Sequence, residues 1–237
     1  SLSDSTIFNP VACPIVSTTY LVNVTDANSC MDTASVTVTV DPLPIVDAGN
    51  DTAICIGDSI QLTASGASTY IWTPNSNISN TSIANPIVFP IVTTTYYVTG
   101  TDVNGCINID SVLVTVNSLP TIAISNDTAI CTGDCAQLNA SGGTNYSWTP
   151  TGSLSNSLIF NPIACPIVAT TYIVTVTDGN NCSDTASVNI SINSLPTIDA
   201  GPDLWLCKGD SIQLNATGGI GYIWTPSLGL SDTTIAN

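Results

Sequence analysis

The sequence carries almost no positive charge. Its 237 residues include 17 acidic side chains, one basic side chain and no histidine, so the formal net charge is -16. All the acids are Asp, and Lys208 is the only cation. A chain this poor in Lys and Arg cannot neutralise phosphates, so we expect no nucleic-acid partner and no binding to an anionic membrane.

The reagents of most enzyme chemistry are also missing. Without His, and with a single Lys, the chain lacks the usual general bases and many metal ligands.

No run of apolar residues approaches the length of a membrane span, so we expect no membrane insertion. Hydrophobic residues make up 43% and charged residues 8%, which is too apolar for a disordered acidic tail. The sequence therefore predicts a folded protein that is not an enzyme.

The sequence repeats itself with a period of 76 residues. Trp72, Trp148 and Trp224 are spaced 148-72=76 and 224-148=76. The same step relates further cysteines and prolines, namely Cys55, Cys131 and Cys207, then Cys30, Cys106 and Cys182, then Pro44, Pro120 and Pro196.

The period divides the chain into four parts. Cutting after each Leu-Pro pair gives two complete modules, 45-120 and 121-196, which we call the first copy and the second copy. The C-terminal part of a module (1-44) precedes them, and the N-terminal part of another (197-237) follows. Since the sequence starts and stops inside modules, we expect it to belong to a longer array.

Within a copy the residue pattern is that of short strands. Ile60, Leu62 and Ala64 alternate with polar neighbours, as do Tyr96 and Val98. Gly, Asn, Asp, Ser and Pro separate these runs, and no stretch has helical spacing. The sequence predicts an all-β fold of tandem immunoglobulin-like sandwiches. In the first copy the expected strands are one ending at 51-55, then 59-65, 69-73, 82-89, 94-102 and 107-117.

Short motifs recur in a fixed order along each copy. In the first copy they are Ala48-Gly49-x-Asp51, Ile54-Cys55-x-Gly57-Asp58-Ser59, Tyr70-x-Trp72-x-Pro74, Asn85-Pro86, Thr94-Thr95-Tyr96 and Thr101-Asp102-x-Asn104-Gly105-Cys106. This series resembles the tandem Ig-like and PKD-like repeats of very large secreted surface proteins of Bacteroidetes, including gliding-type adhesins exported by the type IX system. The resemblance covers the whole chain and departs from the pattern mainly at turns. It implies an extracellular stalk, adhesin or fibre.

The nine cysteines indicate an oxidising compartment. The two that occur in every copy suggest disulfides within each copy, Cys55–Cys106 and Cys131–Cys182. In an immunoglobulin sandwich, however, the two turns concerned lie at opposite ends, and Cα atoms more than about 7 Å apart cannot be bridged. The competing pairing joins one module to the next, for example Cys55 to Cys182. The sequence leaves both pairings open.

A second pair of cysteines covaries between copies. Cys135 and Cys165 stand where the first copy has Ser59 and Phe89, so one copy has both cysteines and the other has neither. The start of strand B and the end of strand E meet in this fold, which predicts a Cys135–Cys165 disulfide. Cys13 occupies the position of the repeat that Cys165 occupies in the second copy. We therefore expect the partner of Cys13 to lie upstream of residue 1.

Two aspartate pairs could gather oxygen ligands for calcium, Asp47 with Asp51 and Asp102 with Asp110. Turns closed by the aspartate side chains explain these residues more simply, so we expect no cofactor or metal and keep calcium as the alternative.

The tryptophan of each copy is expected in the core. Trp205, where the other copies have Ala53 and Ala129, is the better candidate for an exposed contact.

Seven Ser or Thr residues follow an Asp and precede a small or aliphatic residue. This triplet is similar to the O-glycosylation acceptor of Bacteroidetes periplasmic and surface proteins, although a composition rich in Asp, Ser and Thr also generates it by chance. The candidate sites are Thr33, Thr52, Ser59, Ser111, Thr128, Thr185 and Ser211.

We expect a structural or adhesive extracellular protein that forms a stiff stalk or fibre at the cell surface. Its partners would be the neighbouring modules of the same chain and other copies in a fibre; the sequence does not identify a glycan, host or substratum ligand. The alternative is a carbohydrate-binding accessory module of a secreted enzyme, which would need exposed aromatic residues in register. Aromatics make up only 6% of the chain.

Overall fold

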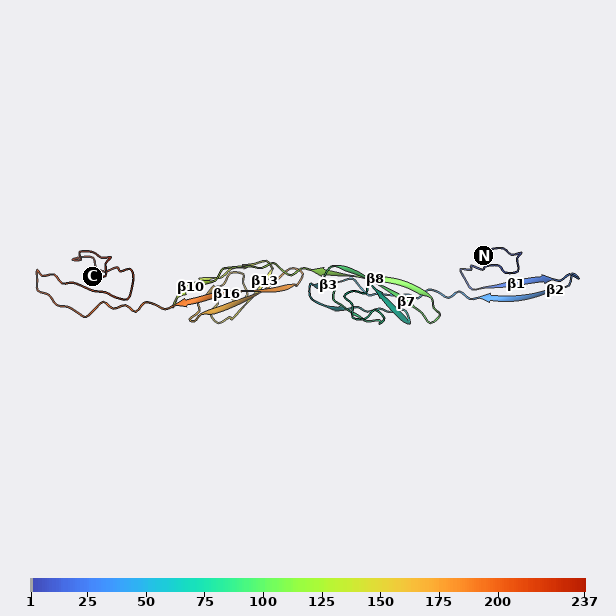
Figure 1. Ribbon diagram of the computed structural model, residues 1–237, viewed down its shortest axis with the longest axis horizontal. Coiled ribbons are helices and arrows are strands. Elements are labelled where there is room, and N and C mark those ends of the chain that lie inside the picture. The colour runs from blue at the N-terminus through green and yellow to red at the C-terminus, as the bar shows by residue number, and fades with distance from the viewer. Residues whose placement is uncertain (1) are drawn as a thin grey trace. The chain divides into compact units, whose positions relative to one another are not determined.

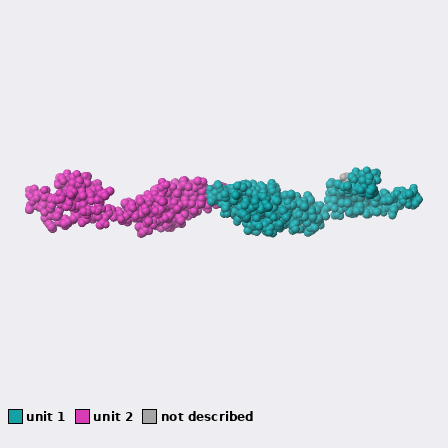
Figure 2. Space-filling view, viewed as in Figure 1, with its two compact units in different colours: residues 1–119 teal, residues 120–237 magenta. Residues whose placement is uncertain are grey.

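The computed structural model describes residues 2–237, which form β-strands joined by turns (Figure 1). The chain divides into two compact units, residues 1–119 and 120–237 (Figure 2). The first unit contains the first copy except Pro120, and the second unit contains the whole second copy. Residues 2–237 contain no helix long and apolar enough to cross a membrane.

The first copy has a four-stranded sheet in the order β3-β8-β7-β5 and a two-stranded sheet of β4 and β6. β3 runs parallel to β8, and the other pairs are antiparallel. Two isolated bridges, Asp47 with Ser65 and Ile78 with Val88, extend the smaller layer. The strands are β3 (Thr52–Cys55), β4 (Ile60–Gln61), β5 (Thr69–Thr73), β6 (Ile87–Val88), β7 (Thr94–Thr101) and β8 (Ile107–Asn117).

The second copy has the same layers in the order β10-β16-β15-β13 and β11-β14, with an additional pair formed by β9 and β12. β10 is parallel to β16, as β3 is to β8. The strands are β9 (Ala123–Ile124), β10 (Thr128–Cys131), β11 (Ala136–Gln137), β12 (Ala140–Ser141), β13 (Asn145–Thr149), β14 (Ile163–Ala164), β15 (Thr170–Thr177) and β16 (Ser183–Asn193).

Each copy closes its own core between these two layers. Alternate residues of β7 and β8 point inward, so that Tyr96, Val98, Val112 and Val114 are fully or almost fully buried against Trp72. The Trp72 indole Nε1 donates a hydrogen bond of 3.0 Å to the carbonyl oxygen of Ile83, so its polar group is satisfied inside the core.

The core of the second copy is built in the same way. Trp148 donates a bond of 2.9 Å to the carbonyl oxygen of Ile159, and Tyr172 and Val174 bury their side chains completely. Two antiparallel layers of this kind, one joined by a first strand that runs parallel to the last, define an all-β protein of immunoglobulin-like sandwiches.

The expected strands differ from the observed ones mainly in the smaller layer. Strands expected at 94–102 and 107–117 are present as β7 and β8, while 59–65 contributes only β4 and 82–89 only β6. The backbone of the shortened strands is still paired, because the N–H groups of Leu62 and Ala64 donate to the carbonyl oxygens of Pro86 and Ala84. The layer is therefore held by single bonds that do not form a regular ladder.

The flanking partial modules have less burial. Residues 2–44 form the hairpin of β1 (Thr18–Thr25) and β2 (Met31–Val38). Val22 and Val36 on it are 53% and 62% exposed, whereas the equivalent Val98 and Val112 are 0% and 1% exposed. The difference arises because the first copy covers these positions with Trp72 and the smaller layer.

Candidate functional site

The cysteines lie at the two ends of each copy, which we call its poles. In the first copy, Cys55 is the last residue of β3 and lies opposite Asn117, the last residue of β8. The chain leaves the copy immediately after Asn117, so Cys55 marks the C-terminal pole. In the second copy the same register places Cys131 opposite Asn193.

The other cysteine of each copy lies at the N-terminal pole. Cys106 precedes β8, and its N–H donates to the Asp102 carboxylate over 2.8 Å in the turn between β7 and β8. The incoming chain reaches the same pole, because the Asn108 amide donates a bond of 3.0 Å to the carbonyl oxygen of Pro44. Cys106 and Cys55 are therefore separated by the length of β8.

This separation makes the pairings expected within a copy wrong. β8 has 11 residues, and a strand of that length spans about 33 Å at its usual rise per residue. A disulfide requires Cα atoms within about 7 Å. Consistently, Cys106 and Cys131 are free thiols, so neither Cys55–Cys106 nor Cys131–Cys182 is formed. Cys55 and Cys182 are both disulfide-bonded.

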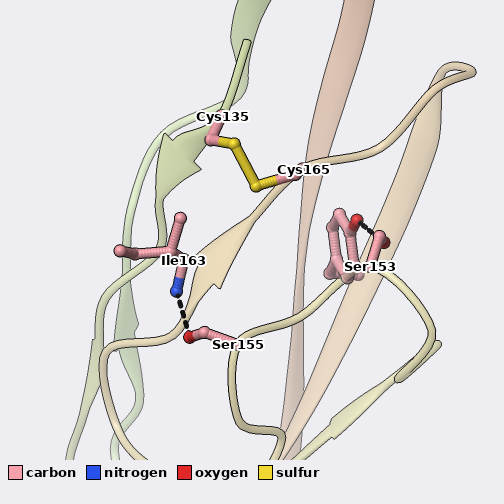
Figure 3. Close-up of a disulfide and its surroundings, with 6 residues drawn as sticks. Cys135, Ser153, Ser155, Ile163 and Cys165 are labelled. Carbon is pink, nitrogen blue, oxygen red and sulfur yellow. Dashed lines mark hydrogen bonds between the residues drawn. A yellow bond between two sulfur atoms is a disulfide. The ribbon is translucent and has the colours of Figure 1, made fainter. Parts of the chain in front are cut away.

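The Cys135–Cys165 disulfide is present, with a Cα–Cα distance of 4.2 Å (Figure 3). Cys135 immediately precedes β11 and Cys165 follows β14, whose antiparallel register sets Ala136 opposite Ala164. The adjoining loop is also fixed, since the Ile163 N–H donates to the Ser155 hydroxyl over 2.9 Å. The bond therefore closes the smaller layer of the second copy.

Burial raises the pKa of the Cys106 thiol, and the carboxylates of Asp102 and Asp41 raise it further by repelling the thiolate. Because the thiolate is the reactive form, Cys106 is expected to react slowly with alkylating agents near neutral pH.

The turn aspartates act as hydrogen-bond acceptors for backbone N–H groups. Asp47 accepts from Gly49, Asp102 accepts from Asn104 and Cys106, and Asp51 accepts from Leu113 across the sheet. Residues 2–237 contain no group of three or more Cys, Asp or Glu side chains that could hold a metal ion. The absence of calcium remains a prediction.

Asp26 occupies the equivalent turn of the partial module before the first copy. Hydrogen bonds from the backbone N–H groups of Cys30 and Asn28 lower the pKa of its carboxyl group. This carboxylate therefore stays ionised and keeps the turn closed to a lower pH than an ordinary Asp.

Two groups of aromatic residues differ in exposure. Trp72 and Trp148 are 1% and 0% exposed, which leaves no ring face for a ligand. Trp205 is 88% exposed, as expected for a surface contact.

The candidate glycosylation residues lie at accessible positions. Thr33, Ser59, Ser111, Thr128, Thr185 and Ser211 are exposed, and Thr52 is half-buried. Their hydroxyl groups can be reached by a modifying enzyme, and their modification remains a prediction.

The hydrogen bonds that hold the incoming chain to the first copy were not predicted from the sequence. The Ala48 N–H donates to the Asp110 carboxylate over 2.8 Å, across 62 positions of sequence. Together with the bond from Asn108 to Pro44, it fixes the joint to the first copy. The only available signal is that Asp110 becomes Ala186 in the second copy, where Ile124 pairs with Ala140 through β9 and β12.

Neither the family models nor the curated proteins gave a match to this sequence. Among solved structures, the chain is similar to DIP-gamma IG1+IG2, with 13% identity and a TM-score of 0.32 over 65% of this chain and 99% of that one. It is also similar to a Ca2+-stabilized adhesin with which an Antarctic bacterium binds ice, with 12% identity and a TM-score of 0.38 over 78% of this chain and 60% of that one. A third is the DSCAM N-terminal eight Ig domains, with 15% identity and a TM-score of 0.29 over 85% and 36%. Because these identities and TM-scores are low, the assignment of the fold rests on the strand order and registers described above.

Proposed function

We propose that this chain is part of an extracellular stalk or fibre whose function is reach and mechanical strength, and which carries an adhesive role at the cell surface. The observation that carries the proposal is that two complete copies follow one another, each with its own closed core. A chain that closes a core in every repeat can be extended copy by copy.

The joints between modules support a stiff array. They are Asp41-Pro42-Leu43-Pro44, Asn117-Ser118-Leu119-Pro120 and Asn193-Ser194-Leu195-Pro196, and none contains Gly. Proline restricts the backbone of a linker, and the first of these joints is also held by the side chain of Asn108. The longest strand of each copy, β8 or β16, has 11 residues. A strand of that length with its joint gives about 35–45 Å for each module along the array.

The cysteines and the surface support an extracellular location. Disulfides persist in oxidising compartments, and four cysteines are bonded here. The resemblance to type IX secreted repeat proteins of Bacteroidetes supports a bacterial surface as the location of the stalk. Glycans on the Asp-Ser and Asp-Thr sites would help to keep a surface that is almost free of Lys, Arg and Glu in solution.

The alternative function, carbohydrate binding, has less support. The tryptophan that recurs in every copy is buried in both complete copies, so it cannot stack on a sugar ring. Trp205 is exposed but has no counterpart in the other copies, so it does not form a repeated platform.

Negative-stain imaging of a chain with three complete copies tests the proposal. We expect straight particles with a contour length of roughly 105–135 Å, three times the spacing given by a strand of this length. Rounded particles would contradict the stalk. Affinity electrophoresis through gels containing polysaccharides addresses the alternative, because a carbohydrate-binding module would be retarded and Trp205→Ala would abolish the retardation.

A further inference from the structure

We propose that the outer face of the four-stranded sheet in the first copy is a docking surface for the same face of a second chain. The two sheets pair face to face about a two-fold axis, so that each chain contributes the same residues. The inference deepens the proposed function, because it names the surface through which the chains of a fibre associate, and to that extent it rests on the proposed function.

The outer face is made by the side chains that alternate with the core residues. In β7, Val98 points into the core, so its neighbours Tyr97 and Thr99 point away from the core on the other side of the sheet. The strand registers fix which residues of the neighbouring strands share that side. Thr99 lies between Ile71 of β5 and Ile109 of β8.

Large apolar side chains are exposed together on this face, and we call them the apolar patch. Four of them are between 51% and 58% exposed, namely Ile71, Tyr97, Ile107 and Ile109. The partly exposed Leu113 continues the patch along β8. Tyr97 is at the centre, diagonal to one patch residue of β5 and two of β8, and side chains in such diagonal positions lie within reach of one another. A contiguous exposed apolar patch marks an interaction site.

The second copy does not carry this patch. Four of its five members are replaced by residues with hydroxyl or amide groups, and only Tyr97 keeps an apolar counterpart, Ile173. The replaced pairs are Ile71 and Ser147, Ile107 and Ser183, Ile109 and Thr185, and Leu113 and Asn189. Because the larger sheets of the two copies share their strand order and register, the fold does not require apolar residues at these positions.

The absence of charge on the outer face favours a second chain as the partner. Within β3, β5, β7 and β8 the charged residue is Asp110, which lies on the core side of the sheet and accepts a hydrogen bond from the Ala48 N–H. Asp51 borders the face, and its carboxylate accepts the Leu113 N–H. Two chains with a net charge of -16 each can therefore meet here without placing a carboxylate at the centre of the contact.

A cationic partner fits this face less well. The patch offers it no counter-charge, and the field of the chain would draw it to the turns that carry the Asp side chains. A sheet, in contrast, packs well on another sheet, with the side chains of the two faces interdigitating about 10 Å apart.

The size of the face fits a weak, reversible interface. The four strands contain 4, 5, 8 and 11 residues. With about 3.3 Å along a strand for each residue and about 4.8 Å between strands, they cover roughly 440 Å² in plan. Two such faces together bury roughly 900 Å², which belongs with weak and transient interfaces below about 1,200 Å². We expect a dissociation constant between about 10 μM and 1 mM.

One candidate glycosylation residue lies on the same face. Ser111 is exposed and stands opposite Tyr97 in the register of β7 and β8. A glycan at Ser111 would stand in the middle of the contact, so the pairing requires an unmodified serine. The chain for the tests below is therefore produced in a host that does not add the glycan.

Sedimentation equilibrium of the full chain, with its free thiols alkylated so that no disulfide can link two chains, tests the pairing. Over roughly 5 μM to 1 mM, which brackets the expected constant, we expect a reversible equilibrium between monomer and dimer. Raising NaCl from about 0.05 to 0.5 M should strengthen the dimer, because salt screens the repulsion between two acidic chains. A chain that stays monomeric throughout would overturn the inference, as would a dimer that salt dissociates.

Variants that give the first copy the residues of the second locate the contact. Ile71→Ser with Ile109→Thr should weaken the dimer at least about tenfold, and circular dichroism checks that the variant is folded. Val103→Ser is the matched control, because Val103 is 86% exposed in the turn between β7 and β8, outside the outer face. Equal weakening by the control would mean that the association is not specific to the patch.

Photo-cross-linking identifies the surface of the second chain, and it keeps the test decisive if the double variant folds poorly. With p-benzoylphenylalanine in place of Tyr97, a mixture of isotope-labelled and unlabelled chains should give cross-links between chains to β5, β7 or β8. Cross-links to other strands of the second chain would contradict the inference. Neither method measures particle length, so a monomeric chain that is still elongated in images would refute the pairing and leave the stalk proposal standing.

Discussion

The two complete copies hold their incoming chains by different bonds. The first copy uses side chains, since the Asp110 carboxylate accepts from Ala48 and the Asn108 amide donates to Pro44. The second copy has Asp184 and Ala186 at those positions. Both copies also pair the incoming chain through the backbone, Asp47 with Ser65 in the first copy and β9 with β12 in the second. The two side-chain bonds of the first copy are therefore additional to a backbone pairing that the copies share.

The copies also differ in how they close the smaller layer. The second copy closes it with the Cys135–Cys165 bond, whereas the first copy has Ser59 and Phe89 at the same places. The larger sheets nevertheless share their strand order and register. The core pattern is therefore sufficient for the fold, and the covalent bond adds stability to one copy.

A third difference is a compensated change of size. Gly100 and Ala67 of the first copy become Val176 and Gly143 of the second. A Cβ added to Gly100 would lie 2.7 Å from the Ala67 Cβ, and one added to Gly143 would lie 2.5 Å from Val176 Cγ1. Each copy therefore has room for one larger side chain at this contact, and the copies place it on opposite partners.

The largest expected effect comes from exchanging the disulfide. Replacing Cys135→Ser together with Cys165→Phe gives the second copy the residues of the first. Because the bond closes a separation of 30 residues, its loss should lower the free energy of unfolding of that copy by about 3–4 kcal/mol on the chain-entropy view. Hydrogen exchange read by mass spectrometry for each copy separately measures the change.

The reverse exchange is the control. Ser59→Cys with Phe89→Cys should protect the first copy in the oxidised state only. Equal loss of protection in both copies after Cys135→Ser with Cys165→Phe would show that the comparison between copies is mistaken.

The next effect concerns the compensated contact. Gly100→Val alone should destabilise the first copy by about 1–3 kcal/mol, because the added methyl groups meet Val46 and Ala67. Adding Ala67→Gly should recover part of that loss, since it recreates the arrangement of the second copy. A double-mutant cycle in urea measures the coupling. Strictly additive effects would mean that the two positions change size independently.

A smaller effect is expected at the joint of the first copy. Asp110→Ala leaves the N–H of Ala48 without its acceptor, and Ala48 is only 2% exposed. We expect a cost of about 1–2 kcal/mol, the usual price of an unpaired buried donor. Thermal unfolding monitored by circular dichroism tests it. Asp184→Ala in the second copy is the matched control and should change stability much less.

The smallest effect should be that of calcium removal. Asp47 and Asp110 exist only in the first copy, where the second has Ala123 and Ala186, so a calcium site at these residues would stabilise the first copy alone. If the aspartates act only as backbone acceptors, chelation should leave both copies unchanged within about 0.5 kcal/mol. Selective melting of the first copy in chelator would reveal an ion site.

The sequence predicts the longer strands better than the short ones. β7 and β8 lie within a residue of the expected ranges because long runs of β-branched residues with alternating burial specify them. The short strands β4 and β6 were overestimated, since regular pairing there depends on the opposite strand as much as on local residues.

The cysteines show the same limit. Covariation between copies was enough to identify Cys135 and Cys165 because both residues change together. Cys55 and Cys106 occur together in every copy, so covariation does not distinguish a disulfide within a copy from one between copies. The parallel register of β3 with β8 places Cys55 at the C-terminal pole, away from Cys106, and so excludes the disulfide within the copy.

The central claim, a stiff array of independent modules, is tested most directly by small-angle X-ray scattering on a chain of three complete copies. The account predicts a maximum dimension at least roughly twice the 50–60 Å of a compact globule of that size. Replacing Ser118-Leu119-Pro120 and its counterpart with Gly-Ser-Gly should shorten it. A maximum dimension of about 50–60 Å for the unaltered chain would contradict the claim.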